Sequence, residues 1–214
     1  MKDIVIYGAG GMGKEVVWLI ENINLTHQTW TILGFLVDDE YSTGDNQFIR
    51  GYPIFPANEW LSNHHNEIYV VCGIGKSTVR KSIYEKVIKF PHVKLATLID
   101  PTVRVDESVT IGAGTLICRN CTVTVDTKIG CGVLMNTGSS VGHDSEVGDY
   151  CTLLTNSIVA GRTTLGECCE IGSGAFILQG KSIIANIVVA PISSIFKDIT
   201  ESGTYAGNPA RRMI

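Results

Sequence analysis

A large apolar side chain occupies every sixth position of this chain from Ile99 to Ile195, with no insertion or deletion. A period of six matches neither the 3.6-residue repeat of an α-helix nor the two-residue repeat of a β-strand. It is typical of a parallel β-helix, in which each hexad forms one short strand and one turn and three hexads close a triangular coil. The positions in register are Ile99, Val105, Ile111, Ile117, Val123, Ile129, Met135, Val141, Val147, Leu153, Val159, Leu165, Ile171, Ile177, Ile183, Val189 and Ile195. They predict a left-handed parallel β-helix of about six coils, an exception to the usual right-handed crossover.

A second track of small residues lies two positions before these apolar residues. Side chains two apart on a strand share a face, so each rung is expected to point one large and one small side chain inward. The small residues are Thr115, Cys121, Thr127, Ser139, Ser145, Cys151, Ser157, Thr163, Cys169, Ala175 and Ser193. Glycine often follows the apolar residue directly, and we expect it to serve the corners, where the chain turns sharply. These glycines are Gly112, Gly130, Gly142, Gly148, Gly166 and Gly172.

The first 97 residues contain no hexads and alternate between strand-like and helix-like segments. This alternation is typical of a small Rossmann-like α/β domain, with a parallel sheet and helices on its faces. The expected strands cover residues 2–7, 31–37, 67–72 and 95–98, and the expected helices cover 14–22 and 77–90. The predicted units are therefore an α/β domain (1–97), a left-handed β-helix (98–197) and a C-terminal tail that caps the helix (198–214).

A glycine-rich turn follows the first expected strand. The run Gly8-Ala9-Gly10-Gly11-Met12-Gly13 fits the pattern G-x-G-x-x-G between a strand and a helix, where backbone N–H groups can bind phosphate. Asp38 ends the second strand, 25 residues past Gly13, where a carboxylate would meet a ribose hydroxyl. The domain is small, which favours the nucleotide of a nucleotide-sugar over a dinucleotide. The alternative is a tight turn without a ligand.

A second turn, Gly73-Ile74-Gly75-Lys76, follows the third expected strand. Ligands of open α/β sheets bind near the carboxyl ends of parallel strands. We therefore expect Gly73, Ile74 and Lys76 to contact the substrate, with Lys76 and Arg80 as phosphate partners. The alternative is that both cations are only solvated.

Of five histidines, only His143 lies in the hexad repeat. It is two residues past Val141, at a turn, so its side chain should project outward. Asp144 follows directly, and a neighbouring carboxylate can orient an imidazole and raise its basicity. The alternative is an ordinary surface histidine.

Composition limits the possible partners. Net charge is −4 and no basic cluster stands out, which argues against nucleic acid. No stretch approaches the ~20 apolar residues of a membrane span, so no membrane insertion is expected.

Seven cysteines without a secretory leader indicate reduced thiols and a cytoplasmic protein. Cys118 and Cys121 lack further ligands, so no metal is expected. Cysteines on the small track should be buried and poor nucleophiles, which argues against a covalent cysteine intermediate.

Several motifs together resemble the hexapeptide-repeat sugar acyltransferases, which include sialic acid O-acetyltransferases and N-acetyltransferases of UDP-4-amino-sugars. The motifs are Gly8-Ala9-Gly10-Gly11-Met12-Gly13-Lys14, Asn136-Thr137-Gly138, Val141-Gly142-His143-Asp144, Ala160-Gly161 and Ala206-Gly207-Asn208-Pro209-Ala210. The resemblance implies that His143 is the general base, that Asp144 supports it, and that the Gly161 backbone N–H contacts the acetyl carbonyl. Gly161 lies eighteen residues after His143, which places it one coil above on the same edge.

The resemblance also implies acetyl-CoA as co-substrate, bound along Gly142, Ala160 and Gly161, with Pro209 and Arg211 of the tail at its adenine end. Arg212 is a second candidate for its 3′-phosphate; the alternative is that the tail is an end cap without a ligand and that both arginines are only solvated. The acceptor would be a sugar or UDP-sugar held by the glycine turns, and a homotrimer would wall the groove. The expected function is acetyl transfer by direct attack in bacterial surface glycan synthesis. Amine and hydroxyl acceptors both stay open.

Two residues depart from the family pattern. Met12 stands where a histidine is common, and Thr152 stands where many members carry a second histidine. Two other functions compete with sugar acetylation. One is a non-catalytic nucleotide-binding scaffold, which would not need His143 and Asp144 one coil below Gly161. The other is a small amino-acid acetyltransferase, against which the strand and glycine turn at 4–13 argue, because that family begins with helices.

Overall fold

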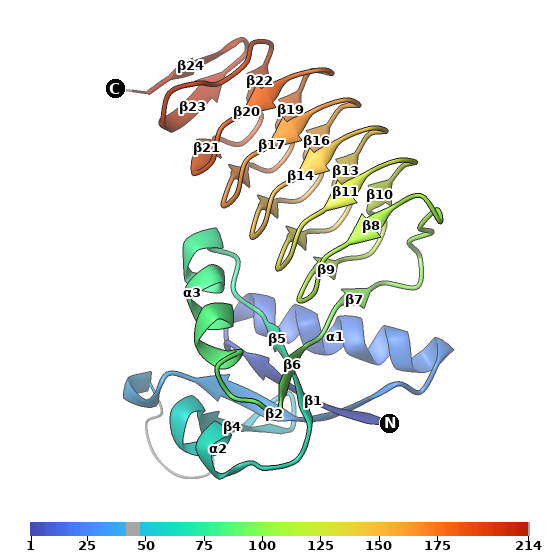
Figure 1. Cartoon of the computed structure of the whole chain (residues 1–214), viewed down its shortest axis with the longest axis vertical. Helices are drawn as coiled ribbons and strands as arrows, with labels where there is room; N and C mark the ends of the chain where they lie inside the picture. Colours follow the sequence, from blue (N-terminus) through green and yellow to red (C-terminus); the bar gives the residue numbers. More distant parts are fainter. Residues whose placement is uncertain (42–47, 214) are drawn as a thin grey trace.

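The computed structural model describes residues 1–41 and 48–213, which form an α/β domain below a three-sided prism (Figure 1). The α/β domain contains one six-stranded sheet in the order β3-β4-β2-β1-β5-β6. All neighbouring pairs are parallel except β3 with β4. The strands are β1 (Lys2–Tyr7), β2 (Trp30–Val37), β3 (Phe48–Ile49), β4 (Tyr52–Pro56), β5 (Ile68–Cys72) and β6 (Val93–Leu95). The helices are α1 (Gly11–Thr26), α2 (Ala57–Asn63) and α3 (Ser77–Val87), with a 3₁₀ turn η1 (Asp39–Tyr41).

The centre of this sheet is fully apolar, because parallel strands are covered on both faces. Ile4, Val5 and Ile6 of β1 are completely buried. Helix α1 buries its apolar stripe, including Val16 and Ile20, against the sheet. The Rossmann-like sheet is confirmed, but the sequence analysis missed β3, β4 and α2. Pro53 and Pro56 in β4 explain part of this, since proline in a short run argues against a strand.

The prism is built mostly from two-residue strands that pair with the strand eighteen residues later, so each coil has three sides. Representative pairs are Thr122 with Ser140, Lys128 with Glu146, and Leu134 with Thr152. The three sheets are named here after β13, β14 and β15, three consecutive strands of one coil. The β13 sheet contains β10 (Thr122–Val123), β13 (Ser140–Val141), β16 (Ile158–Val159), β19 (Phe176–Ile177) and β22 (Ser194–Ile195). The β14 sheet contains β8 (Thr110–Ile111), β11 (Lys128–Ile129), β14 (Glu146–Val147), β17 (Thr164–Leu165) and β20 (Ser182–Ile183). The β15 sheet contains β7 (Leu98–Ile99), β9 (Leu116–Ile117), β12 (Leu134–Met135), β15 (Thr152–Leu153), β18 (Glu170–Ile171), β21 (Ile187–Val189), β23 (Gly203–Gly207) and β24 (Ala210–Arg212).

Both predicted tracks fill the prism. Every sixth residue from Ile117 to Ile195 is buried, and so are all the small residues of the second track. Val105 is an exception to the hexad prediction, because it is 37% exposed and lies in no strand. Asp100 and Asp106 each accept a hydrogen bond from the backbone N–H two residues later, and these tight turns replace the missing strand. The fold class, an α/β domain followed by a left-handed parallel β-helix, is confirmed.

The glycines after the apolar residues have a different role from the expected one. A β-carbon on Gly142 would lie 2.5 Å from the backbone nitrogen of Gly161 in the next coil, so glycine permits close approach between coils. The left-handed backbone occurs three residues after the apolar position instead, as at Asp144 with φ 58°. Asparagine, aspartate and glycine tolerate that conformation best and fill many of these sites.

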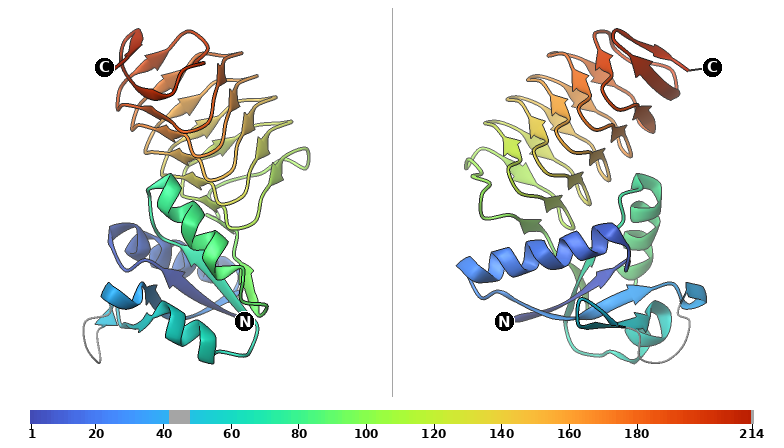
Figure 2. Two further views of the ribbon diagram at one scale, coloured as in Figure 1. Left: turned by 60° about the vertical axis from the view of Figure 1, so that its left-hand side comes forward. Right: turned by 180° about the vertical axis from the view of Figure 1, so that it is seen from behind.

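The two parts meet at two places. Helix α1 runs beneath the first coils, and α3 stands beside one corner of the prism (Figures 1 and 2). We call this the α3 corner; it carries Gly114, Gly132, Tyr150 and Cys168 at successive coils. At the other end the hairpin β23–β24 extends the β15 sheet beyond the last coil. In the part of the chain described, no helix is long and apolar enough to cross a membrane. β6 ends at Leu95 and β7 begins at Leu98, while the division into three units stays a prediction.

Candidate active site

His143 lies on the turn that joins β13 to β14, at the corner between two sheets. Its Nδ1 is 2.6 Å from Oδ2 of Asp144, and both side chains are about half exposed, at 52% and 54%. A carboxylate can only accept, so in the neutral imidazole Nδ1 carries the proton and Nε2 has a free lone pair. The imidazole is therefore accessible to solvent, and Asp144 orients it.

Gly161 lies directly above His143 on the next coil. A β-carbon at this position would be 2.7 Å from Nε2 of His143, so the imidazole occupies the space that glycine leaves open. The backbone N–H of Arg162 donates to the carbonyl of His143 at 2.7 Å and ties the two turns together. No acceptor within residues 1–41 and 48–213 pairs with the Gly161 N–H. A proton acceptor and a free N–H donor thus lie side by side.

This corner continues upward as a ridge. We call it the His143 ridge; with an eighteen-residue repeat it carries Val125, His143, Gly161, Gln179 and Lys197. Three coils separate His143 from Lys197, a rise of about 14 Å at the usual strand spacing. A hollow of about 530 Å³ lies at the top of the ridge, where Lys197 meets the tail residues Pro209 and Arg211.

The two tail arginines, Arg211 and Arg212, differ in their hydrogen-bond partners. Arg212 donates to Ser202 at 2.8 Å and pairs with Glu201 at 3.2 Å. Arg211 donates only to the adjacent carbonyl of Ala210, at 3.1 Å, among the described residues. Arg211 is therefore the better placed of the two to meet an anion in the hollow.

The glycine-rich turn divides into two kinds of glycine. Gly8 has φ 103°, and a β-carbon there would lie 2.7 Å from Cγ1 of Ile74. A β-carbon on Gly73 would lie 2.7 Å from Cα of Gly13, and one on Gly13 would overlap the carbonyl of Gly8. Gly10 and Gly11 face open space at the start of α1. Gly8, Gly13 and Gly73 therefore serve packing, whereas Gly10 and Gly11 leave room for a ligand at the helix N-terminus.

Asp38 lies where the sequence places it, at the carboxyl end of β2. Its Oδ1 accepts from the Tyr7 hydroxyl at 2.6 Å and from Lys86 at 3.0 Å. The Tyr7 hydrogen bond lowers the pKa of Asp38 and outweighs partial burial, with further help from Lys86. Burial, with the bond to Asp38, raises the pKa of Tyr7. Asp38 lines a hollow of about 350 Å³ with Thr78, Ser82 and Lys86 of α3. The sequence analysis missed Tyr7 and Lys86; the position of Tyr7 at the end of β1 was the available signal.

The two residues expected to bind phosphate, Lys76 and Arg80, both form bonds to other parts of the chain. Lys76 forms an ion pair with Glu170 of the prism at 3.2 Å. Arg80 is completely buried and donates to backbone carbonyls and one hydroxyl, so it has no free N–H for a phosphate. Of the two departures from the family pattern, Met12 packs against the core and the Thr152 hydroxyl is bound by Arg80.

The structure does not bring all candidates together. The glycine turns pack near the α3 corner, whereas His143 and Gly161 occupy the corner between the β13 and β14 sheets. No described contact joins the two groups within one chain.

The free cysteines are mostly buried, and burial raises the pKa of Cys118 to about 12. Within the described ranges no cluster of three metal-binding side chains occurs.

Known proteins resemble this chain in sequence and in fold. Residues 3–87 match the PglD N-terminal domain family. UDP-N-acetylbacillosamine N-acetyltransferase of Bacillus subtilis (strain 168) is 30% identical over 119 residues, 55% of this chain and 51% of that protein. The match thus spans about half the length of this relative.

Solved structures match over the whole chain. The acetyltransferase domain of PglB from Neisseria gonorrhoeae FA1090 has a TM-score of 0.87 and 26% identity, with 100% of both chains covered. A second structure of that domain, with 99% of both chains covered, is a complex with acetyl coenzyme A. WeeI from Acinetobacter baumannii AYE has a TM-score of 0.88 and 28% identity, again over 100% of both chains. The comparisons confirm the resemblance to sugar acetyltransferases and support the predicted enzyme class, an acyltransferase that uses acetyl-CoA.

Proposed function

Because the chain carries a PglD N-terminal domain and has the fold of the sugar acetyltransferases, we propose that it transfers the acetyl group of acetyl-CoA to the amino group of a nucleotide-linked amino sugar. One observation carries the proposal. The His143 imidazole, oriented by Asp144 at 2.6 Å, lies against Gly161, the residue with a free N–H one coil above. The choice of amine over hydroxyl rests on the N-acetyltransferase named among the relatives.

The proposed reaction is direct transfer. Nε2 of His143 accepts a proton from the amine while the amine nitrogen attacks the thioester carbon. The new C–N bond places negative charge on the carbonyl oxygen, which the Gly161 N–H stabilises. The C–S bond then breaks, and the departing thiolate takes the proton from the imidazolium. A positioned base contributes roughly 10²–10⁴-fold to such a rate, and one oxyanion donor contributes roughly 10²–10³-fold.

Two further parts of the proposal concern the ligands. Acetyl-CoA would lie along the His143 ridge, with its acetyl end at Gly161 and its nucleotide end in the hollow near Pro209 and Arg211. The nucleotide of the acceptor would lie at Gly10, Gly11 and Asp38, where the helix N-terminus faces open space and Asp38 lines the hollow beside α3. The role in surface glycan synthesis and the cytoplasmic location rest on the resemblance alone and stay predictions.

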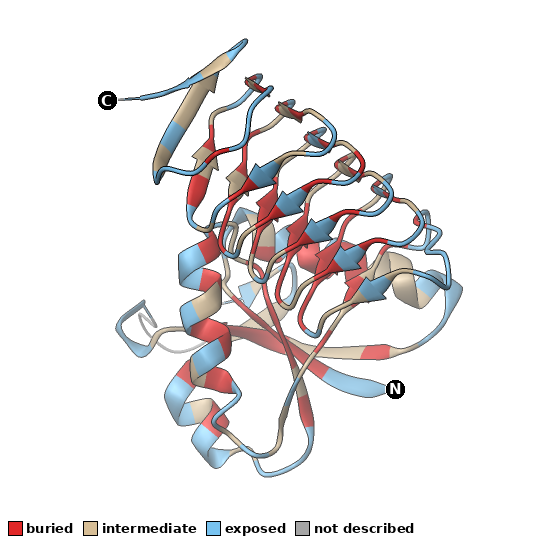
Figure 3. Cartoon of the chain, turned by 45° about the horizontal axis from the view of Figure 1, so that its top comes forward, coloured by how far each residue is buried: buried red, intermediate tan, exposed pale blue. Residues whose placement is uncertain are grey.

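We also propose a homotrimer. The outward side of the β13 sheet is apolar toward its C-terminal end, with Ile158 and Phe196 exposed by 44% and 43%. The outward side of the β14 sheet carries charged residues such as Lys128 and Glu146 and is solvent-exposed (Figure 3). Covering the β13 sheet with a second copy would bring the acceptor turn of one chain toward the ridge of the next. That arrangement would unite the two groups of site residues that one chain keeps apart.

Incubation with acetyl-CoA and a panel of UDP- and GDP-linked sugars, with either an amino or only hydroxyl groups, tests the function. We expect thiol release with one amino sugar and a product heavier by an acetyl group. His143→Ala should lower turnover roughly 10²–10⁴-fold while coenzyme A binding persists. His27→Ala, an exposed histidine at the end of α1, is the matched control and should retain parental turnover.

The alternatives predict other results. A nucleotide-binding scaffold would bind the nucleotide sugar and release no thiol with any acceptor. Free serine in the same panel tests the amino-acid acetyltransferase. Parental turnover in His143→Ala would remove this histidine from the mechanism.

A further inference from the structure

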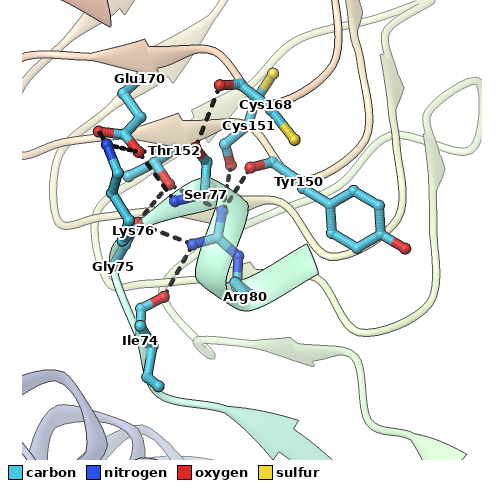
Figure 4. Close-up of polar contacts among 10 residues, drawn as sticks. All are labelled: Ile74, Gly75, Lys76, Ser77, Arg80, Tyr150, Cys151, Thr152, Cys168 and Glu170. Carbon is cyan, nitrogen blue, oxygen red and sulfur yellow. Dashed lines mark hydrogen bonds and ion pairs between the residues drawn. The ribbon is translucent and has the colours of Figure 1, made fainter. Parts of the chain in front are cut away.

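The guanidinium of Arg80 is the most heavily bonded side chain between the two parts of the molecule (Figure 4). Arg80 is 0% exposed, although it is the largest of the fully buried side chains. A buried charge needs partners, and here every partner is neutral. Its acceptors are the carbonyls of Ile74, Gly75, Gly132, Tyr150 and Cys151 and the hydroxyl of Thr152, at 2.7–3.0 Å.

These acceptors come from two sides. Nη1 binds the loop between β5 and α3, at Ile74 (2.9 Å) and Gly75 (3.0 Å). Nε and Nη2 bind the prism, from Gly132 on one coil to Tyr150 and its neighbours on the next. The Thr152 hydroxyl accepts from Arg80 and donates to the Gly75 carbonyl at 2.8 Å, which closes the ring. All five N–H groups of the guanidinium are used.

The prism also supplies the cap of helix α3. The residue before this helix, Lys76, makes no capping bond of its own with its side chain. Glu170 of β18 instead accepts from the Ser77 backbone N–H at 3.0 Å and from the Ser77 hydroxyl at 2.7 Å (Figure 4). The first turn of α3, and the loop before it, are therefore held by groups from the other part of the molecule.

The loop that Arg80 binds is in direct contact with the glycine-rich turn. Ile74 packs on Gly8, and Gly73 packs on Gly13. These contacts are so close that none of the three glycines has space for a β-carbon. A continuous series of rigid contacts thus runs from the prism coils through Arg80 and Ile74 to the N-terminus of α1. A shift of Arg80 would move the open glycines Gly10 and Gly11 relative to the coils.

We propose that Arg80 is a positioning residue for acetyl transfer: it holds the acceptor-binding turns at a fixed place along the prism, and the Thr152 hydroxyl links it to Gly75. The proposal rests on the proposed function, because it assigns the acceptor to the glycine turns and the acetyl donor to the prism. It also accounts for Thr152, whose hydroxyl faces Arg80 and Gly75 rather than solvent.

The test compares Arg80→Lys, Arg80→Met and Thr152→Val with the parent protein. Lysine offers three donors to six acceptors, and valine keeps the shape of threonine without its hydroxyl. We expect kcat/KM for the acceptor to fall about 100-fold in Arg80→Met, the usual result of a displacement of about 1 Å. Thr152→Val should lose about tenfold, since it removes the hydrogen bond to the charged Arg80 together with the one to the Gly75 carbonyl. The Kd of coenzyme A, bound toward the far end of the prism, should stay within about twofold.

The matched control is Lys81→Met. Lys81 lies next to Arg80 on α3 and pairs with Glu167 of the prism at 3.0 Å, but the two side chains of this pair are still 31% and 46% exposed. It should leave acceptor kinetics within about twofold of the parent. Hydrogen exchange supplies a readout that needs no acceptor. Amides of 8–13 and 73–76 should exchange faster in Thr152→Val, while amides of the coils from 152 to 195 keep their protection.

The outcomes separate the two proposals. If the parent acetylates no sugar, the proposed function fails, and the exchange rates of 8–13 and 73–76 still decide the role of Arg80. If Thr152→Val folds with parental acceptor kinetics and parental exchange in both turns, the positioning role is wrong. Equal losses in acceptor kcat/KM and in coenzyme A binding would also overturn it, because they would indicate general destabilisation. Thr152→Val keeps the test valid if Arg80→Met fails to fold.

Discussion

At the scale of single residues, His143 and Gly161 share one space. A β-carbon on Gly161 would meet the imidazole at 2.7–2.9 Å, so a larger residue there would displace the histidine as well as shield the N–H. Substitution of Gly161 therefore tests both groups at once and cannot isolate the oxyanion contact. Asp144 can be tested cleanly, because its backbone and its carboxylate have separable roles.

Asp144→Asn is expected to lower turnover by less than His143→Ala does. Asparagine tolerates φ 58° as aspartate does, so the turn should persist. The amide has no charge to stabilise an imidazolium and no longer selects the tautomer with a free Nε2. Steady-state kinetics with the acceptor found in the panel provide the measurement.

Asp126→Asn is the matched control for that change. Asp126 occupies the same corner one coil below, with φ 56°, and lies beside Val125 instead of a histidine. Parental turnover is expected. If Asp126→Asn and Asp144→Asn lose the same activity, the effect belongs to the turn and not to the carboxylate next to His143.

At the scale of elements, the glycine-rich turn combines packing and binding positions in one motif. Gly13→Ala should destabilise the domain severely, since its β-carbon would overlap the Gly8 carbonyl. Gly11→Ala should leave the melting temperature unchanged or slightly raised, because its β-carbon meets nothing within 4 Å and alanine favours a helix. Gly11→Ala should still weaken binding of the nucleotide sugar. Thermal melts and calorimetry check both; equal melts for the two variants would contradict the packing assignment.

Helix α3 depends on a carboxylate from another element, which predicts a pH effect. Burial opposes ionisation of Glu170, but hydrogen bonds from Ser77 and the contact with Lys76 outweigh it and lower the pKa. A lowered folded-state pKa stabilises the protein above the unfolded value of about 4.3, and this contribution disappears as pH falls through the folded-state pKa. Glu170→Gln should therefore be less stable than the parent at pH 7, by about 1 kcal/mol.

The difference should shrink as pH falls below about 4.5, because the parent carboxyl then becomes neutral as well. Denaturant melts of both proteins across this range give the measurement. Glu85→Gln is a suitable control, since Glu85 is an exposed residue of the same helix that lies away from its first turn. A difference between parent and Glu170→Gln that grows toward acid pH would contradict the assigned role.

At the scale of the whole molecule, the glycine turns lie apart from the His143 ridge within one chain. The proposed trimer would bring the glycine turns of one chain close to the ridge of the next. Ile158→Asp places a charge on the exposed apolar side of the β13 sheet and should convert the trimer to smaller species, with loss of turnover. Thr164→Asp, on the exposed side of the β14 sheet, should change neither. Light scattering coupled to gel filtration measures both. A parent that is monomeric and fully active would exclude the trimer.

Much of this architecture could be predicted from the sequence, because it depends on local period. A residue repeat of six can bury one large and one small side chain per rung only in a three-sided coil, and residues from Ile117 onward obey it. The outward position of His143 and its place below Gly161 follow from the same register. Val105 does not follow it, because a strand at that place would lie at the open edge of the prism, where pairing is optional.

The sequence by itself determined the coil, the strand–turn–helix of the glycine loop, and the spacing of imidazole and amide donor. Only the tertiary structure decided what the polar residues near the loops do. Arg80 and Lys76 read as ligands for phosphate, yet they bind the prism through contacts that span 52 to 94 positions of the chain. Hydrogen bonds between distant segments leave no period in the sequence, so a cation that binds a ligand and one that joins two parts of a molecule look the same until the chain is folded.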